Sequence, residues 1–165
     1  MNPEPLYAFL AEQGIDYRRH DHPPVFTCQE AERLVPAMAA ARTKNVFVRD
    51  RPGKRHFLVV VGYDKRVDLK RLAEVLETSK LSLGSPERLM KHLGVEPGSV
   101  TILGLLNDQQ GQVELVLDQP IAEAPSVRCH PLVNTSTLEL EAEGLTRFLE
   151  ATGHQPRIIA VPGLS

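Results

Sequence analysis

The chain, 165 residues long, lacks the features that define several large classes of protein. No apolar run approaches the ~20 residues that a helix needs to span a membrane. The N-terminus lacks the basic and then apolar pattern of a signal peptide. The two cysteines, Cys28 and Cys129, stand alone with no CxxC pair, which favours reduced thiols over a disulfide framework. These absences predict a soluble, cytoplasmic protein.

A strong net charge is also missing. There are 19 Lys and Arg residues against 21 Asp and Glu, a net charge of −2, which argues against a protein that coats nucleic acid through bulk charge. The charge is nevertheless uneven. Residues 42–91 hold 13 basic and 6 acidic side chains, whereas residues 101–165 hold 3 basic and 8 acidic ones. A local RNA-binding surface and an ordinary charged exterior both fit this pattern.

Several familiar catalytic signatures are absent. No segment has the spacing of a P-loop, of a dinucleotide fingerprint or of a Gly-x-Ser-x-Gly turn. His20 and His22 lie two apart, but two histidines without a third ligand are poor evidence for zinc, and we interpret them as solvated residues at a strand end. Cys129 and His130 are adjacent on an extended segment and point to opposite faces, so a catalytic Cys–His dyad is not expected.

The local patterns predict an α+β fold. With no repeat, low-complexity tract or linker, we expect one domain over residues 1–165. Strands outnumber helices and do not alternate with them regularly, which predicts a curved mixed sheet with helices on its outside. The Pro52-Gly53 turn indicates an antiparallel hairpin, and a second strand pair is expected after Gly98. The expected helices are 6–13, 27–34, 69–76, 85–94 and 145–151, and the expected strands are 15–20, 45–48, 56–61, 100–106, 113–117, 133–140 and 157–161.

One lysine stands at the entrance of an otherwise apolar strand in residues 43–48 (TKNVFV). Period-two alternation puts the two valines on the face of Lys44, and Asn45 and Phe47 on the other face. An ammonium at the mouth of a buried sheet must reach water, an acid or a bound anion. Lys44 therefore either extends to solvent or marks a site for a ligand phosphate or carboxylate.

Two further segments are chemically unusual. In residues 94–101 (GVEPGSVT) two glycines flank a proline, and such a loop either is a plain turn from helix to strand or directs its amide N–H groups at an anion or oxyanion. In residues 128–137 (RCHPLVNTST) the proline holds His130 extended, so its direction is restricted. A capped loop before a Thr-rich edge strand explains that segment equally well.

Together these three segments resemble a known family. Thr43-Lys44-Asn45-Val46-Phe47, the Gly-x-x-Pro-Gly-Ser loop at 94–99 and His130-Pro131-x-x-Asn134-Thr135 occur in the order found in the YbaK/ProX family of aminoacyl-tRNA editing domains. The resemblance covers nearly the whole chain. Within the family the chain looks most like the free-standing alanyl-prolyl-tRNA deacylases, although cysteinyl-prolyl-tRNA deacylases share the lysine and the glycine loop.

The resemblance implies a barrel-like mixed sheet of the editing-domain type. It also implies hydrolysis of a mischarged aminoacyl-tRNA ester, with Ala-tRNA(Pro) as the first candidate substrate. The alternatives are another mischarged amino acid such as Cys-tRNA(Pro), and a non-catalytic module that binds tRNA or a synthetase. The implied partners are tRNA, through its aminoacylated 3′ end and acceptor stem, and prolyl-tRNA synthetase. No membrane, metal or other cofactor is expected.

The resemblance also implies roles for single residues. Lys44 is assigned to the phosphate or terminal ribose of the tRNA 3′ end. The backbone amides of Gly98 and Ser99 are assigned to the ester carbonyl as negative charge develops. His130 is assigned to orienting the aminoacyl group or the attacking water, with the substrate's own ribose hydroxyl assisting.

The remaining candidates are contacts to the substrate and to the acceptor stem. Proximity to the motifs suggests apolar walls for the aminoacyl pocket, and the basic segment suggests contacts to the stem. The candidate substrate-binding residues are Asn45, Phe47, Leu103, Val133 and Thr135, and the candidate tRNA-binding residues are Lys65 and Arg66.

Overall fold

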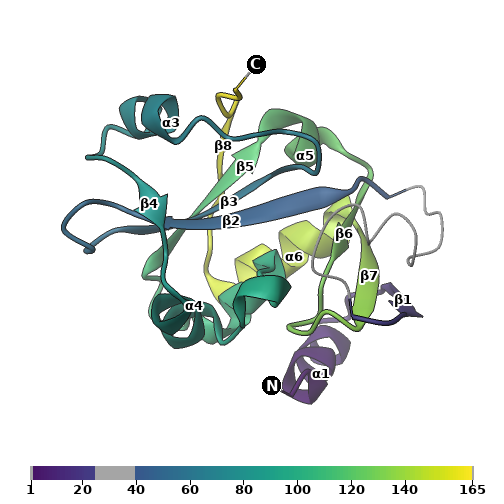
Figure 1. Ribbon diagram of the computed structural model, residues 1–165. Helices are drawn as coiled ribbons and strands as arrows, with labels where there is room; N and C mark the ends of the chain where they lie inside the picture. The colour runs from purple at the N-terminus through teal and green to yellow at the C-terminus, as the bar shows by residue number, and fades with distance from the viewer. Residues whose placement is uncertain (1, 25–39, 165) are drawn as a thin grey trace.

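Two β-sheets form the framework of the protein (Figure 1). The computed structural model describes residues 2–24 and 40–164. The larger sheet has the order β4-β2-β3-β5-β8, with β2 (Thr43–Arg49), β3 (His56–Gly62), β4 (Ser82–Leu83), β5 (Val113–Asp118) and β8 (Arg157–Ile159). Strand β2 pairs antiparallel with β3 and β4, whereas β5 pairs parallel with β3 and β8. The smaller sheet is antiparallel, in the order β1 (Arg18–Asp21), β7 (Ser136–Glu141) and β6 (Ser126–Cys129).

Helices surround these sheets (Figure 1). They are α1 (Glu4–Glu12), α3 (Leu69–Val75), α4 (Pro86–Leu93), α5 (Gln119–Glu123) and α6 (Ala142–Thr152), with the 3₁₀ segments η1 (Pro97–Ser99) and η2 (Ile102–Asn107). The α+β class with a curved mixed sheet is confirmed, and the sheet is not a closed barrel. The helix expected at 27–34 lies outside the described residues.

Local capping signals predict where two of the helices begin. The Asp68 carboxylate accepts from the Arg71 amide, and the Ser85 hydroxyl accepts from the Arg88 amide. Helix α4 ends at Gly94, whose φ of +66° is the left-handed conformation that glycine adopts at little cost. The loop of residues 94–99 therefore begins at a defined position, the end of α4.

The larger sheet has an apolar core on each face. Phe47 belongs to the cluster that also contains residues of α1, α4 and α6, while Val48 and Val46 belong to the cluster beneath Leu72 of α3. The predicted alternation along β2 is confirmed, and so is its antiparallel hairpin with β3. Lys44 consequently takes the face of the two valines.

Two strand predictions were wrong. Residues 102–107 form 3₁₀ helix in place of a strand, with the Thr101 hydroxyl accepting from the Leu103 amide, and β5 pairs parallel with β3. Residues 102–105 are buried throughout, and a continuous apolar run does not distinguish a strand from a buried helical segment. The strand expected from Val133 begins only at Ser136.

A partly buried ion pair ties the segment after β8 to the end of β5. The Lys65 ammonium lies 2.6 Å from Asp118 Oδ2, and the Asp118 side chain is 2% exposed. The same ammonium donates to the Val161 carbonyl at 2.9 Å, and the Val161 amide donates to Asp118 Oδ1 at 2.9 Å. Lys65, a candidate tRNA contact, thus has a structural partner. Reversing the charge of Lys65 would therefore leave the buried Asp118 carboxylate without its partner, in addition to altering any tRNA contact.

We predict that Lys65→Met destabilises the protein. Removing one partner of a buried ion pair costs about 3–5 kcal/mol, and partial exposure of Lys65 reduces that to about 2–3 kcal/mol of unfolding free energy. Urea denaturation measures the loss, and Arg66→Met, an exposed neighbour of equal charge, serves as the control. A Lys65→Met variant within about 0.5 kcal/mol of wild type would show that the pair contributes nothing to stability.

No helix among the described residues has the length and apolar character to cross a membrane.

Candidate functional site

The start of β2 lies beside β6, and this brings two of the three motifs together. Ala41 forms a parallel bridge with Val127, and the Thr43 hydroxyl donates to the Arg128 carbonyl at 2.8 Å. In a parallel pair, residues at the same level share a face. By that register, Lys44 and His130, which lie three residues beyond Ala41 and Val127, project from the same side of the two segments. Thr43 and Arg128, each at the start of its motif, are therefore in contact although they lie 85 positions apart in the sequence.

His130 is held in one orientation as a neutral imidazole. Its Nδ1 lies 3.3 Å from the Ser136 carbonyl, which can only accept, so Nδ1 carries the proton and Nε2 is left as an acceptor. Burial lowers the pKa of His130, and nearby His22 lowers it further. On the opposite face, burial raises the pKa of the Cys129 thiol to about 12, which excludes it as a thiolate nucleophile at neutral pH.

His22 belongs to the same surroundings. Its Nδ1 lies 2.8 Å from the Pro23 carbonyl and its Nε2 lies 2.8 Å from the Thr137 hydroxyl, so Nδ1 donates and Nε2 accepts. The interpretation of His22 as a merely solvated residue was therefore wrong. Its signal was the two-residue spacing from His20, which is paired with Thr137 of β7 in the β1–β7 register.

Two arginines add positive charge on the same face. Arg42 and Arg128 each lie two residues before a motif residue and therefore share a face with Lys44 and His130 respectively. Burial and then the charge of Arg42 lower the pKa of Arg128 while Glu139 raises it, so two guanidinium groups and one carboxylate lie close together. Arg42 stacks on the Tyr63 ring with its Cζ 4.0 Å from the centroid. The site is therefore cationic and suits an anionic ligand.

Lys44 is half-buried in this setting and makes no hydrogen bond or ion pair with any residue that the structure describes. An ammonium that is partly withdrawn from water and placed among other cations gains most from a ligand anion. Of the two interpretations that the sequence left open, the local charge favours the anion site.

The glycine loop is built on α4 and η2. The Asn107 side-chain amide donates to the Leu93 carbonyl at 2.9 Å, which ties η2 to the end of α4. The Ser99 amide already donates to the Glu96 carbonyl at 2.9 Å. Of the two amides assigned to the oxyanion, only that of Gly98 therefore remains a candidate donor. Within the described part of the chain, no hydrogen bond joins Gly98 or Ser99 to Lys44 or His130.

The five candidate substrate contacts fall into three groups. Phe47 and Leu103 are core residues, 3% and 0% exposed. Asn45 has a buried Oδ1 with no hydrogen-bond partner among the residues described, which makes it a ready acceptor for a ligand amine or hydroxyl. Val133 is half-buried and Thr135 is exposed, and the Thr135 carbonyl accepts from the His22 amide at 3.0 Å. Their roles in binding substrate stay predictions.

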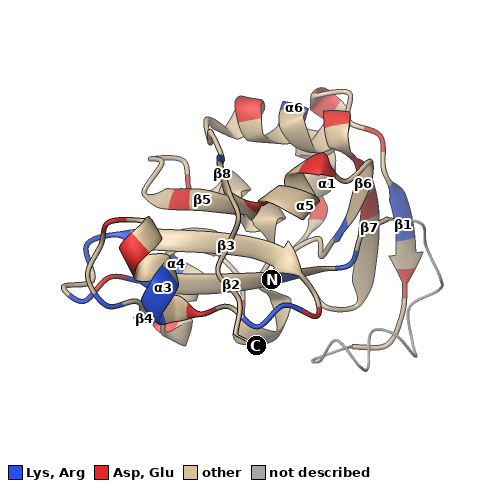
Figure 2. Ribbon diagram, turned by 90° about the horizontal axis from the view of Figure 1, so that it is seen from above, with Lys and Arg blue, Asp and Glu red and all other residues tan. Residues whose placement is uncertain are grey.

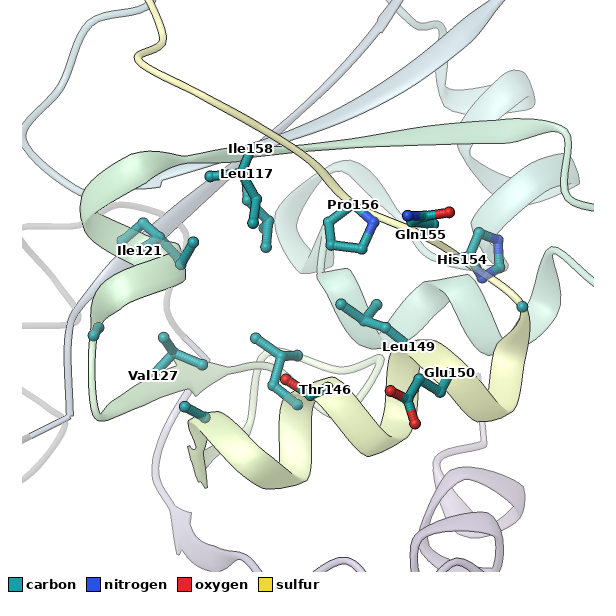
Figure 3. Close-up of a pocket in the computed structure, with 15 residues that line it drawn as sticks. Leu117, Ile121, Val127, Thr146, Leu149, Glu150, His154, Gln155, Pro156 and Ile158 are labelled. Carbon is teal, nitrogen blue, oxygen red and sulfur yellow. The ribbon is translucent and has the colours of Figure 1, made fainter.

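A separate apolar cavity of about 490 Å³ lies between α5, α6 and β8 (Figure 3). Ile121, Val127, Leu149 and Ile158 are among its walls, and none of the candidate site residues lines it. His154 at its edge is bound to Asp108 at 2.9 Å, and that carboxylate also accepts from the Gln112 and Val113 amides. This pair holds a loop together, and the cavity contains no group placed for ester chemistry.

Basic and acidic side chains occupy different parts of the molecule. Figure 2 shows Lys and Arg gathered around the β2–β3 loop, α3 and β4, whereas Asp and Glu predominate around α6. Arg66, the second candidate tRNA contact, is exposed. Among the described residues no group of three or more His, Cys, Asp and Glu side chains could hold a metal ion.

Comparison with known proteins gives the same family that the motifs suggested. The family model for the aminoacyl-tRNA editing domain matches residues 22–148. A prolyl-tRNA editing protein, ProX, of Acetoanaerobium sticklandii is 36% identical over 149 residues, which cover 90% of this chain and 91% of that protein. Prolyl-tRNA synthetase associated domain-containing protein 1 of Danio rerio is 34% identical over 157 residues, covering 94% of this chain and 85% of the relative.

Solved structures share the fold. A crystal structure of a candidate trans-editing enzyme for prolyl-tRNA synthetase superposes with a TM-score of 0.70 at 17% identity, covering 94% of each chain. The hypothetical protein APE2540 superposes with a TM-score of 0.71 at 22% identity, covering 92% of this chain and 95% of that one. At such identities the likeness concerns the fold alone.

Proposed function

The chain belongs to the family of aminoacyl-tRNA editing domains, and from this premise we propose that it is a trans-editing hydrolase that deacylates mischarged tRNA, with Ala-tRNA(Pro) as its substrate. The observation that carries the proposal is the contact between the segments of Lys44 and His130, where the Thr43 hydroxyl donates to the Arg128 carbonyl. The ProX relative is named as a prolyl-tRNA editing protein, which supports proline tRNA as the carrier. The tRNA substrate also makes the cytoplasm the expected location.

The proposed reaction is hydrolysis of the ester between the amino acid and the terminal ribose. Water adds to the ester carbonyl, the C–O bond to the ribose breaks, and the ribose oxygen leaves with a proton. Lys44 binds the phosphate or ribose of the terminal nucleotide and fixes the ester in place. His130 Nε2, free to accept, orients the water or the substrate amine. The Gly98 amide stabilises the oxyanion that forms.

The need for such an enzyme follows from the size of alanine. Alanine is smaller than proline, so a proline site cannot exclude it sterically, and each missing methylene costs a binder only about 1–3 kcal/mol. The resulting errors require a second site that admits the methyl side chain and rejects the pyrrolidine ring. Asn45, whose Oδ1 is buried without a partner among the described residues, lies on the face of β2 opposite Lys44, so its contact with the substrate stays a prediction.

A direct assay tests the proposed function. Purified protein is incubated with proline tRNA charged with alanine, cysteine or proline, and release of the amino acid is followed. We expect rapid hydrolysis of the alanyl ester and no hydrolysis of the prolyl ester. Preferential cleavage of the cysteinyl ester would change the substrate but leave the editing reaction. Binding of all three tRNAs without any hydrolysis would mean that the protein is a binding module.

We predict that Lys44→Ala reduces deacylation roughly 30- to 150-fold. Loss of a charge-assisted contact to phosphate costs about 2–3 kcal/mol, which corresponds to that change in rate. The measurement is kcat/KM with Ala-tRNA(Pro), and an unchanged melting temperature shows that the fold is intact. Lys70→Ala, which removes an exposed lysine from α3, is the matched control. Activity of Lys44→Ala within twofold of wild type would remove Lys44 from the site.

We also predict that the site selects alanine over proline by the volume of the side chain. Overpacking a fixed cavity costs about 1–3 kcal/mol or more, and a proline ring attached to the reacting ester cannot move away without leaving the oxyanion donor. Activity should therefore fall progressively with side-chain volume in a series of charged tRNAs that includes 2-aminobutyrate and N-methylalanine. If N-methylalanine is rejected outright while 2-aminobutyrate is cleaved as fast as alanine, recognition of the amine replaces volume as the basis of selection.

A further inference from the structure

A second cavity, of about 610 Å³, opens at the hairpin end of β2 and β3. The β2–β3 loop, the first turns of α4 and the loop before β5 form its walls. Lys54, Arg88 and Lys91 line it, against the single carboxylate of Glu87. Both ends of α4 contribute to the wall, through Glu87 and Arg88 near its start and through Lys91 and His92 in its last turn. None of these residues belongs to the site around Lys44.

Arg88 is fixed in the wall of the cavity without a carboxylate partner among the described residues. Its Nη1 donates to the Gly53 carbonyl at 3.2 Å and to His56 Nε2 at 2.9 Å. Gly53 has a φ of +73°, and an added Cβ would lie 2.7 Å from Arg88 Nη2, so only glycine lets the guanidinium lie against the loop. The guanidinium keeps further N–H donors for a ligand.

Two buried imidazoles form the inner wall. Because arginine only donates, His56 must accept at Nε2 and carry its proton on Nδ1. His92 is 6% exposed, lines the cavity and makes no hydrogen bond with any residue described here. The two rings lie 4.2 Å apart, and Phe47 stacks behind His56 at 5.7 Å. Burial and neighbouring positive charge lower the pKa of both, that of His56 to about 4, so at neutral pH each ring is neutral and offers one N–H donor.

We infer that this cavity binds a phosphate group of the tRNA backbone, a conclusion that rests on the proposed function. Guanidinium, ammonium and imidazole N–H groups are donors that phosphate oxygens accept from, and the basic groups outnumber the one acid. In the β2–β3 register, Lys44 pairs with Val61 and Arg49 pairs with His56, so the cavity lies five residues, or about 16 Å, along the strand from Lys44. One phosphate cannot contact both places, and the cavity therefore binds a different phosphate from the one near the ester.

The test on tRNA uses the double variant Lys54→Gln/Lys91→Gln. Both side chains are exposed, so the fold and the Arg88 contacts should survive their replacement. The affinity for uncharged proline tRNA is measured as a function of salt. We expect weaker binding and a salt slope shallower by roughly 0.7–0.9 for each phosphate that the variant no longer neutralises. With Ala-tRNA(Pro), kcat should stay within twofold while KM rises. The control, Lys70→Gln/Lys80→Gln, removes two exposed lysines that do not line the cavity. An equal change in the control, or no change in the variant, overturns the inference.

Imidazole NMR separates the source of the phosphate. The ring ¹⁵N signals of His56 and His92, assigned with His56→Gln and His92→Gln, are followed while uncharged tRNA or inorganic phosphate is added to the full protein. Shifts with tRNA at concentrations where inorganic phosphate has no effect support a site for the RNA backbone. A response to inorganic phosphate and not to tRNA would assign the cavity to a free phosphate compound and contradict the inference, as would no response to either.

These readouts distinguish failure of the inference from failure of the proposed function. If the protein does not deacylate any charged tRNA but the histidine signals and the salt slope change as expected, the phosphate site stands and the proposed reaction falls. If deacylation proceeds with unchanged histidine signals, only the phosphate site is overturned.

Discussion

The contact between the start of β2 and strand β6 is the constraint on which the candidate site depends. The Ala41–Val127 bridge and the hydrogen bond from Thr43 to the Arg128 carbonyl hold two segments of different sheets in parallel register. That register decides that Lys44 and His130 share a face. It also brings Arg42 and Arg128 close enough for one to lower the pKa of the other.

Charge is distributed in keeping with this arrangement. Lys65, which contributes to the stability of the fold, forms an ion pair with the buried carboxylate of Asp118. Lys44 has no such partner among the described residues. The basic side chains around the cavity at the hairpin end have none among those residues either, and Glu87 is the one acidic residue that lines that cavity. Lys44 and Arg88, which are both partly buried, carry a desolvation cost that an anionic ligand can offset.

Local signals predicted much of the fold, and long-range contacts account for what they missed. The caps at Asp68 and Ser85 and the alternation along β2 were readable because each depends on residues within a few positions. The segment 102–107 was misread because it is apolar throughout and has no periodicity to reveal its helical turns. The sequence motifs suggested Lys44, Gly98 and His130, but they gave no role to Arg42 or Arg128, and the signal of His22 was only its spacing from His20. Thr43 and Arg128, which bring them together, lie 85 positions apart.

The central claim is that Lys44 and His130 act on the same bound 3′ end, and a double-mutant cycle tests it most directly. The value of kcat/KM for Ala-tRNA(Pro) is measured for wild type, Lys44→Ala, His130→Ala and the double variant. Residues that serve one bound group are not additive, so we expect the double variant to lose at least about fivefold less than the product of the two single losses, a coupling of about 1 kcal/mol or more. Losses that multiply to within twofold would show that the two residues act independently and would contradict a shared site.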